Sequence, residues 1–212
     1  MEEAKTIAEK NNYTLDYLES GSPIFQVKNF YMFTSDSVRL ASFVKETDIT
    51  VLVDFCSGSG IVGLEVVERA NVEKLFMFEV QEELFNASEA SAKLNNRNTK
   101  IYPNLLSVQK AYTVITDADV VVCNPPFFKA GSGGVSTNNS KLLARHEVML
   151  TLEEIFVAAK KVLKIGGKFY LLHITQREKE IENLAKKYGF TIQEKLTLDG
   201  HLKRTIFALK NE

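Results

Sequence analysis

An Asn-Pro-Pro-Phe segment at residues 124–127 follows an apolar, β-branched run at residues 120–123. Such a run is typical of a buried parallel strand, and two prolines end it. Asn124 is therefore expected at the strand's carboxyl end, where open α/β sheets bind their ligands. The side-chain oxygen of Asn124 and the carbonyl of Pro125 can accept hydrogen bonds from a planar NH2 group, and Phe127 offers a flat face. An ordinary turn after a strand could have the same residues. The segment therefore indicates recognition of a planar amine only if a second ligand-binding motif accompanies it.

A glycine-rich segment upstream supplies that second motif. Residues 54–63 read DFCSGSGIVG between an apolar run and a helical stretch, and Gly58, Gly60 and Gly63 satisfy G-x-G-x-x-G. Glu79 lies nineteen positions after Gly60, at the end of a second apolar run, where it can accept hydrogen bonds from ribose hydroxyls. The pattern predicts a nucleotide-binding βαβ unit.

The acid Asp54 helps to choose between cofactors, because the glycines alone also fit a dinucleotide enzyme. A carboxylate at the end of the first strand would repel a pyrophosphate but suits the ammonium group of a methionine moiety. An Asx turn or a helix cap would also place an aspartate there. Asp54 therefore disfavours a nicotinamide dehydrogenase without excluding a purely local role.

Together these motifs resemble motifs I, II and IV of the class I S-adenosylmethionine-dependent methyltransferases that methylate amino groups. More narrowly, FTSDSVRLA at residues 33–41 and ARHE at residues 144–147 are similar to the bacterial tRNA1(Val) adenine-N6 methyltransferases, which act on the adenine beside the anticodon. The resemblance runs from about Phe30 to the C-terminus. It implies S-adenosyl-L-methionine as cofactor, S-adenosyl-L-homocysteine as product, tRNA as substrate and a Rossmann-like fold.

The same resemblance implies three sets of site residues. The catalytic set is Asn124, Pro125, Pro126 and Phe127. The cofactor-binding set is Asp54, Cys56, Gly58, Gly60, Glu79, Val80, Asn104, Leu105 and Asn124. The substrate-binding set is Ser35, Lys129, Arg145 and His146.

Two positions depart from the family's pattern. Asn104 stands where the family usually has an aspartate that binds the cofactor's adenine, and its amide can still accept a hydrogen bond from the adenine amine. Cys56 stands where glycine is common, a change that is harmless if the backbone φ there is negative.

Other acceptors fit the same motifs. Guanine N2 in ribosomal RNA and the glutamine side chain of a peptide-release factor also present a planar NH2 group, so Asn124 cannot separate them from adenine. A non-catalytic nucleotide- or RNA-binding module is disfavoured because the whole motif set is present.

Composition sets outer limits on the class of protein. The chain has 212 residues, 45% of them hydrophobic, and no Pro- or Gly-rich linker, which predicts a single domain over residues 1–212. Within it we expect an N-terminal hairpin and helix (1–45) and a cofactor-binding core (46–212). No apolar run approaches the roughly 20 residues of a membrane span, and the N-terminus is polar, which indicates a cytoplasmic protein. Two cysteines and three histidines give no metal signature, and nothing points to an obligate protein partner, so we expect a metal-free monomer.

Charge is divided unevenly along the chain. Residues 1–127 carry 11 Lys and Arg against 18 Asp and Glu, whereas residues 128–212 carry 15 against 9. The C-terminal half could therefore offer phosphates a basic face, although single lysines usually only solvate a surface.

Strand and helix signals alternate along the chain and predict a mostly parallel, doubly wound α/β sheet. Strands are expected at 51–55, 74–79, 100–102, 119–123, 168–173, 190–197 and 204–210, and helices at 35–45, 61–70, 82–95, 152–163 and 177–188. A hairpin is expected within 13–33. Because only residues 198–203 join the last two strands, the final strand should run antiparallel. The polar, glycine-rich stretch 128–142 is expected to form a lid after the Asn-Pro-Pro-Phe segment.

Overall fold

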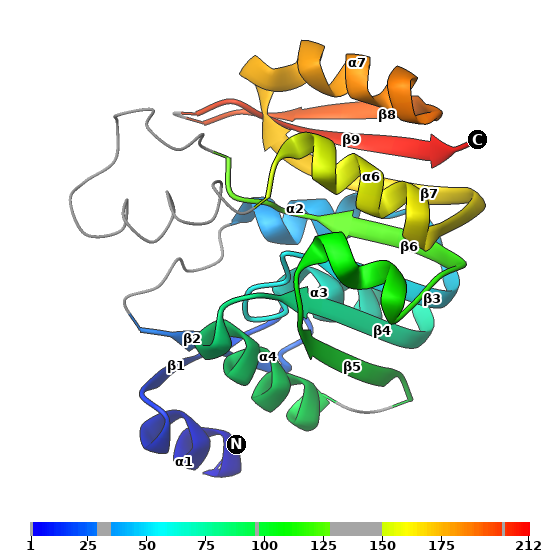
Figure 1. Ribbon diagram of the computed structural model, residues 1–212. Helices are drawn as coiled ribbons and strands as arrows, with labels where there is room; N and C mark the ends of the chain where they lie inside the picture. Colours follow the sequence, from blue (N-terminus) through cyan, green and yellow to red (C-terminus); the bar gives the residue numbers. More distant parts are fainter. Residues whose placement is uncertain (1, 29–34, 96–97, 128–149, 201) are drawn as a thin grey trace.

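A twisted seven-stranded sheet forms the centre of the computed structural model, which describes residues 2–28, 35–95, 98–127, 150–200 and 202–212 (Figure 1). The strand order is β5-β4-β3-β6-β7-β9-β8. The strands are β3 (Asp48–Phe55), β4 (Asn71–Glu79), β5 (Lys100–Leu105), β6 (Ala118–Cys123), β7 (Leu163–Ile174), β8 (Phe190–Leu198) and β9 (Arg204–Asn211). Strand β9 alone runs opposite to the other six strands of this sheet. The predicted fold class and the antiparallel last strand are confirmed.

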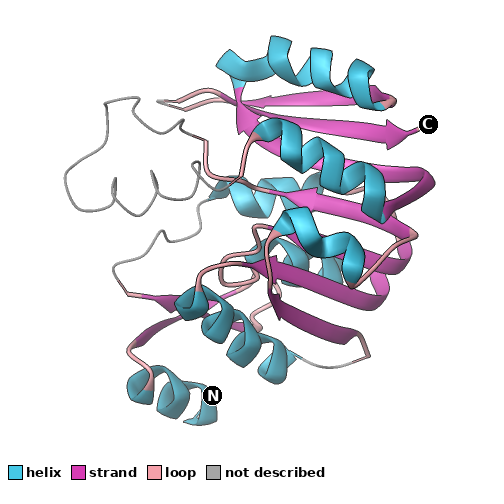
Figure 2. Ribbon diagram, in the orientation of Figure 1, coloured by secondary structure: helices cyan, strands magenta, loops and turns pink. Residues whose placement is uncertain are grey.

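Helices cover both faces of the sheet, so its central strands are buried on two sides (Figure 2). Along β6, Val121 and Cys123 enter the core under one helical layer, and Val120 and Val122 enter the core under the other. The first layer contains η1 (Val108–Thr113), α6 (Leu152–Val162) and α7 (Glu178–Tyr188); the second contains α2 (Ser35–Phe43) and α3 (Ile61–Arg69). Alternating side chains thus explain the continuous apolar run at 120–123.

Helix and strand limits follow local chemistry. Helix α6 begins after a capping box, in which the Thr151 hydroxyl accepts from the Glu154 amide and the Glu154 carboxylate accepts from the Thr151 amide. Several strands have other limits than predicted: β3, β4 and β7 begin three to five residues earlier, at Asp48, Asn71 and Leu163. Strand β5 continues from the predicted end at 102 to Leu105, because it stays paired with β4 up to Glu79. The short 3-10 helices η1 and η2 (Thr175–Arg177) were not predicted.

The N-terminal segment forms a small unit of its own: α1 (Glu2–Lys10) and the antiparallel hairpin β1 (Tyr13–Tyr17) and β2 (Pro23–Val27). It packs against α4 (Glu82–Asn95), where the Ser91 hydroxyl accepts a hydrogen bond from the Phe25 amide. That residues 1–212 form one domain stays a prediction.

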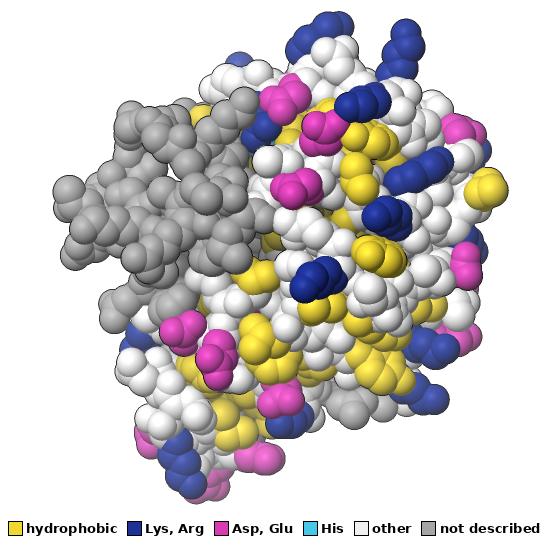
Figure 3. Space-filling view, in the orientation of Figure 1, with side chains coloured by type: hydrophobic (Ala, Val, Ile, Leu, Met, Phe, Trp, Pro, Cys, Tyr) yellow, Lys and Arg dark blue, Asp and Glu magenta, His cyan; other side chains and the backbone are white. Residues whose placement is uncertain are grey.

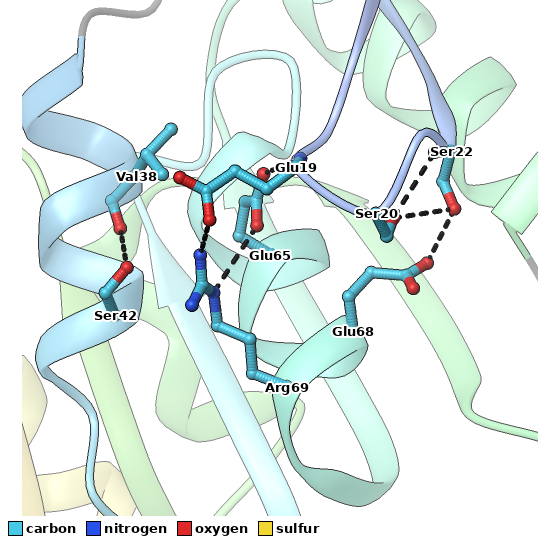
Figure 4. A network of polar contacts seen from close by, with 8 residues as sticks. All are labelled: Glu19, Ser20, Ser22, Val38, Ser42, Glu65, Glu68 and Arg69. Carbon is cyan, nitrogen blue, oxygen red and sulfur yellow. Dashed lines mark hydrogen bonds and ion pairs between the residues drawn. The ribbon is translucent and has the colours of Figure 1, made fainter.

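The hairpin turn is also tied to helix α3 by a polar network (Figure 4). The buried carboxylate of Glu65 accepts a hydrogen bond from the Glu19 amide at 2.8 Å and lies 3.5 Å from the Arg69 guanidinium. Glu68 accepts from the Ser22 hydroxyl at 2.8 Å. These bonds connect the N-terminal unit to the helix that follows the glycine loop.

Among the described residues, no helix is long and apolar enough to cross a membrane, and no cluster of three or more His, Cys, Asp or Glu side chains could hold a metal ion.

Candidate active site

A cavity of about 230 Å³ opens at the carboxyl ends of β3, β4 and β6. Its wall is mostly apolar and comes from six segments that lie far apart in the sequence. They are the glycine loop (Cys56, Gly58), the end of β4 and start of α4 (Phe78, Glu79, Val80, Gln81, Leu84), the start of η1 (Leu106, Ser107, Val108, Gln109), the motif Asn124 to Phe127, and Leu150, Leu202 and Arg204. The predicted juxtaposition of the glycine loop, Glu79 and the Asn-Pro-Pro-Phe segment is therefore present.

The glycines of the loop meet two different physical demands. Gly60 has φ +91°, and an added Cβ there would lie 3.0 Å from the Met77 sulfur. Gly63 lies in α3, and a Cβ there would approach Leu75 to 2.9 Å and the Asp54 carboxylate to 3.1 Å. The first demand is a left-handed turn, and the second is close packing of helix on strand.

Cys56 departs from the expectation of a negative φ. Its φ is +55°, a conformation that costs a non-glycine residue on the order of 1 kcal/mol, so the replacement of glycine is not harmless to the backbone. Burial, together with the neighbouring Cys56 thiol, raises the pKa of Cys123. Cys123 is a buried small hydrophobe as predicted, whereas Cys56 is half-buried and lines the cavity.

Glu79 holds the floor of the cavity together. One carboxylate oxygen accepts from the amides of Val80 at 2.8 Å and Gln81 at 2.9 Å, and the other accepts from the Gly58 amide at 2.9 Å. A carboxylate offers about four acceptor positions, so about one remains for a ligand hydroxyl. Glu79 can therefore bind a ribose while fixing the glycine loop to β4.

Asp54 lies behind the glycine loop and is not part of the cavity wall. Its side chain is 1% exposed, and one oxygen accepts from the Gly63 amide at 2.9 Å. The other oxygen has no partner among the described residues. Burial raises the pKa of Asp54 to about 7, and the negative charge of Glu79 adds to the rise. Direct contact with a ligand ammonium remains a prediction.

Asn104 and Leu105, which were expected to contact the adenine of a nucleoside, lie on β5 just before the residues that line the cavity. The Asn104 amide donates to the carbonyls of Tyr102 at 2.7 Å and Met77 at 3.3 Å, and neither Asn104 nor Leu105 lines the wall. Because β5 continues to Leu105, the chain reaches the cavity only at Leu106 and Ser107. The Ser107 side chain makes no capping bond to η1, so its hydroxyl can bind a ligand there.

The Asn124 amide is oriented by helix α2. Its Nδ2 donates to the Ser37 hydroxyl at 3.0 Å, and no described residue donates to its Oδ1. That orientation leaves the oxygen available to accept from a ligand NH2 group. Ser35, the predicted substrate contact on the same helix, is exposed and does not line the cavity. Ser37 was missed because only the tertiary fold brings α2 to β6.

Phe127 is more buried than the prediction of an exposed face for stacking requires. Its side chain lines the cavity, but the residue is only 8% exposed. The His173 ring packs against it in a T-shaped arrangement, with centroids 5.4 Å apart, and the Arg204 guanidinium lies over its ring at 5.7 Å. Burial, helped by the charge of Arg177, lowers the pKa of His173 to about 4, so the ring is neutral at pH 7. Pro125 and Pro126 complete this wall.

Three of the predicted substrate contacts cannot be placed. Lys129, Arg145 and His146 lie outside the described residues, as does the whole of the expected lid at 128–142.

The charge asymmetry gives no continuous basic patch on the face that Figure 3 shows, where Lys and Arg stand apart with acids among them. Lys195 contacts both Glu178 and Glu182, and Lys187 contacts Glu153, so these lysines are neutralised locally. Charge counts along the sequence therefore do not by themselves locate a phosphate-binding face.

Comparisons with known proteins agree with this arrangement. A family model described as the methyltransferase small domain matches residues 35–195. Among curated relatives, a tRNA1(Val) (adenine(37)-N6)-methyltransferase from Dyadobacter fermentans is 26% identical over 175 residues, covering 82% of this chain and 72% of that protein. The protein of the same name from Cytophaga hutchinsonii is 26% identical over 185 residues, covering 84% and 76%.

Solved structures show the same fold. The M. jannaschii tRNA m1G37 methyltransferase superposes with a TM-score of 0.69 at 18% identity, covering 94% of this chain and 57% of that one. A precorrin-6y C5,15-methyltransferase from Geobacter metallireducens superposes with a TM-score of 0.60 at 17% identity, covering 89% and 94%. This chain thus spans just over half the length of the M. jannaschii protein. At these identities the structures support the fold and not the substrate.

Proposed function

Because this chain belongs to the methyltransferase small domain family, we propose that it transfers a methyl group from S-adenosyl-L-methionine to N6 of the anticodon-adjacent adenine of tRNA-Val. The observation that carries the proposal is the orientation of Asn124. Its Nδ2 is engaged by Ser37, which leaves its oxygen to accept a hydrogen bond in a cavity that Asn124 lines together with the glycine loop and Glu79.

The cavity fits the cofactor at several points. Gly58 lines the wall with no atom within 4 Å of the position of an added Cβ, which leaves room for a ligand against the backbone. Glu79 retains about one acceptor position for a ribose hydroxyl, and Ser107 offers a hydroxyl for the adenine edge. Val80 and Leu106 supply apolar contacts for the ring.

The residues of the chain then position the acceptor rather than ionise it. The cofactor supplies a methyl group bonded to a sulfonium sulfur, and the neutral thioether that this sulfur becomes is a good leaving group. Asn124 Oδ1 and the Pro125 carbonyl accept hydrogen bonds from the acceptor NH2, which favours a tetrahedral nitrogen with an available lone pair. The buried wall around Phe127 excludes water from the line of attack. Orientation supplies most of the rate enhancement, and the proton leaves to water after transfer.

Adenine is favoured over other planar amines by the relatives. Curated proteins that match over more than four-fifths of this chain are named as adenine-N6 methyltransferases of tRNA1(Val). We infer that this chain shares their acceptor and acts in the cytoplasm, as a monomer without an obligate protein partner.

The test is methylation of an unmodified tRNA-Val transcript, with mass spectrometry of the nucleosides. We expect N6-methyladenosine at the anticodon-adjacent position and none when that adenine is replaced by guanine. Ribosomal RNA and a release factor are offered in parallel reactions. Methylation of either one in place of tRNA would refute the acceptor assignment and leave the cofactor assignment intact.

A further inference from the structure

Arg204 occupies the acceptor side of the cavity. It is the first residue of β9, the strand that no motif marked in the sequence. Its guanidinium carbon lies 5.7 Å from the centroid of Phe127, and its side chain lines the cavity with 25% of its surface exposed. Arg204 therefore lies beside the ring of the Asn-Pro-Pro-Phe motif in the cavity wall.

The guanidinium is held in place from helix α2. Arg204 Nη1 lies 2.5 Å from the carboxylate of Asp36, whose side chain is 12% exposed. Asp36 is adjacent to Ser37, which holds Asn124. One turn of α2 thus orients both the amide that faces the acceptor amine and the arginine beside it.

The remaining donors of Arg204 suit a planar ligand with acceptor atoms at its edge. A guanidinium carries five N–H donors, and Asp36 is the one acceptor that the described residues provide to it. The Nε atom is buried without any acceptor among those residues. Because His173 and Arg204 pack on Phe127, the ring has little open face for a base, whereas the Arg204 guanidinium keeps donors for the edge of a base.

We propose that Arg204 recognises the acceptor base by donating a hydrogen bond to a ring nitrogen at the edge of the purine, with Asp36 holding the guanidinium in position. The proposal rests on the proposed function, because it requires a nucleobase acceptor. A glutamine side chain has no ring nitrogen, so Arg204 would also favour RNA over a protein acceptor.

The experiment compares Arg204→Lys with wild type on the tRNA-Val transcript. Lysine keeps the charge but loses the planar fork. We expect a KM for RNA raised by about 10-fold or more, in the range of a lost hydrogen bond from a charged group, with S-adenosylhomocysteine affinity unchanged within about twofold. Asp36→Asn should shift KM in the same direction by less. Arg69→Lys is the matched control, since Arg69 also pairs with carboxylates but lies outside the cavity, and it should behave as wild type.

A second measurement separates recognition from a structural role. Transcripts carry 1-deaza-, 3-deaza- or 7-deazaadenine at the target position, each lacking one ring nitrogen. We expect one of them to slow wild type by about 10-fold and to cause little further loss in Arg204→Lys, because both changes remove the same hydrogen bond.

Three outcomes would overturn the proposal. Wild-type KM and rate in Arg204→Lys would show that the guanidinium does not touch the base. Insensitivity of wild type to all three deaza substitutions would remove the donated hydrogen bond. Failure of wild type to methylate any RNA would refute the proposed function itself, and the inference with it, whereas the first two outcomes leave that function standing.

Discussion

Replacing Asp54 by asparagine should stabilise the folded protein at high pH. The Asp54 carboxyl is 1% exposed, accepts one hydrogen bond from the Gly63 amide and has one oxygen without a partner among the described residues. Asparagine has nearly the same shape and can keep the bond from Gly63 through its oxygen. The substitution therefore removes the buried charge and little else.

The size of the effect follows from the pKa. Burial raises the pKa of Asp54 to about 7 from an ordinary value of 3.8. Between these values the folded state binds more protons than the unfolded state, so the stability that Asp54 contributes falls as pH rises through that window. At pH 8 the ionised carboxylate costs the fold about 4 kcal/mol. The unpaired N–H of asparagine costs about 1 to 3 kcal/mol, which leaves a net gain of about 1 to 3 kcal/mol.

Urea unfolding at pH 5 and pH 8 measures this directly. At pH 5 the Asp54 carboxyl is protonated in the folded state but largely ionised in the unfolded state, which costs wild type about 1.5 kcal/mol, close to the cost of the unpaired asparagine N–H. The two proteins should therefore agree within about 1.5 kcal/mol at this pH. Asp119→Asn is the control of opposite sign, because hydrogen bonds from Lys164 and Val51 outweigh its partial burial and lower the pKa of Asp119. It should lose stability relative to wild type as pH rises from acid to neutral. An Asp54→Asn protein that is less stable than wild type at pH 8, or a difference independent of pH, would refute the reasoning.

Three further predictions concern the cavity. Glu79→Ala should weaken S-adenosylhomocysteine binding in calorimetry by about 1.5 to 3 kcal/mol, because a charged acceptor is lost from the ribose and the glycine loop; affinity within threefold of wild type would contradict this. Asn124→Ala should leave cofactor affinity nearly intact and lower single-turnover methylation of tRNA by orders of magnitude, since its contact forms with the acceptor amine. Ser37→Ala should lower the same rate less, by about 10-fold, and Ser37→Thr should restore it, because threonine keeps the hydroxyl that orients Asn124. Equal rates in wild type and Ser37→Ala would show that the amide needs no such support.

Local sequence signals were sufficient to predict the fold and the two motifs that form the site, the glycine loop with Glu79 and the Asn-Pro-Pro-Phe segment. Alternation of strands and helices predicted the doubly wound sheet, because side-chain periodicity and turn residues act over a few neighbours in the chain. The short link at 198–203 predicted the antiparallel β9 for the same reason. The glycine loop, Glu79 and Asn124 were found because each follows directly after a buried strand, and parallel strands bring such positions to one edge.

Only the tertiary structure decided how those residues are held and what faces them. Ser37 and Asp36 lie almost ninety residues before Asn124, and Arg204 lies about eighty after it, so no local pattern links them. The end of β5 is set by its pairing with β4. Because that pairing continues to Leu105, Ser107 lines the cavity in place of the predicted Asn104. The sign of φ at Cys56 depends on how the loop closes over β4, not on the residue's own preference. Sequence thus determined which chemistry the edge of the sheet carries, whereas packing between distant elements determined which atoms of those residues face the cavity.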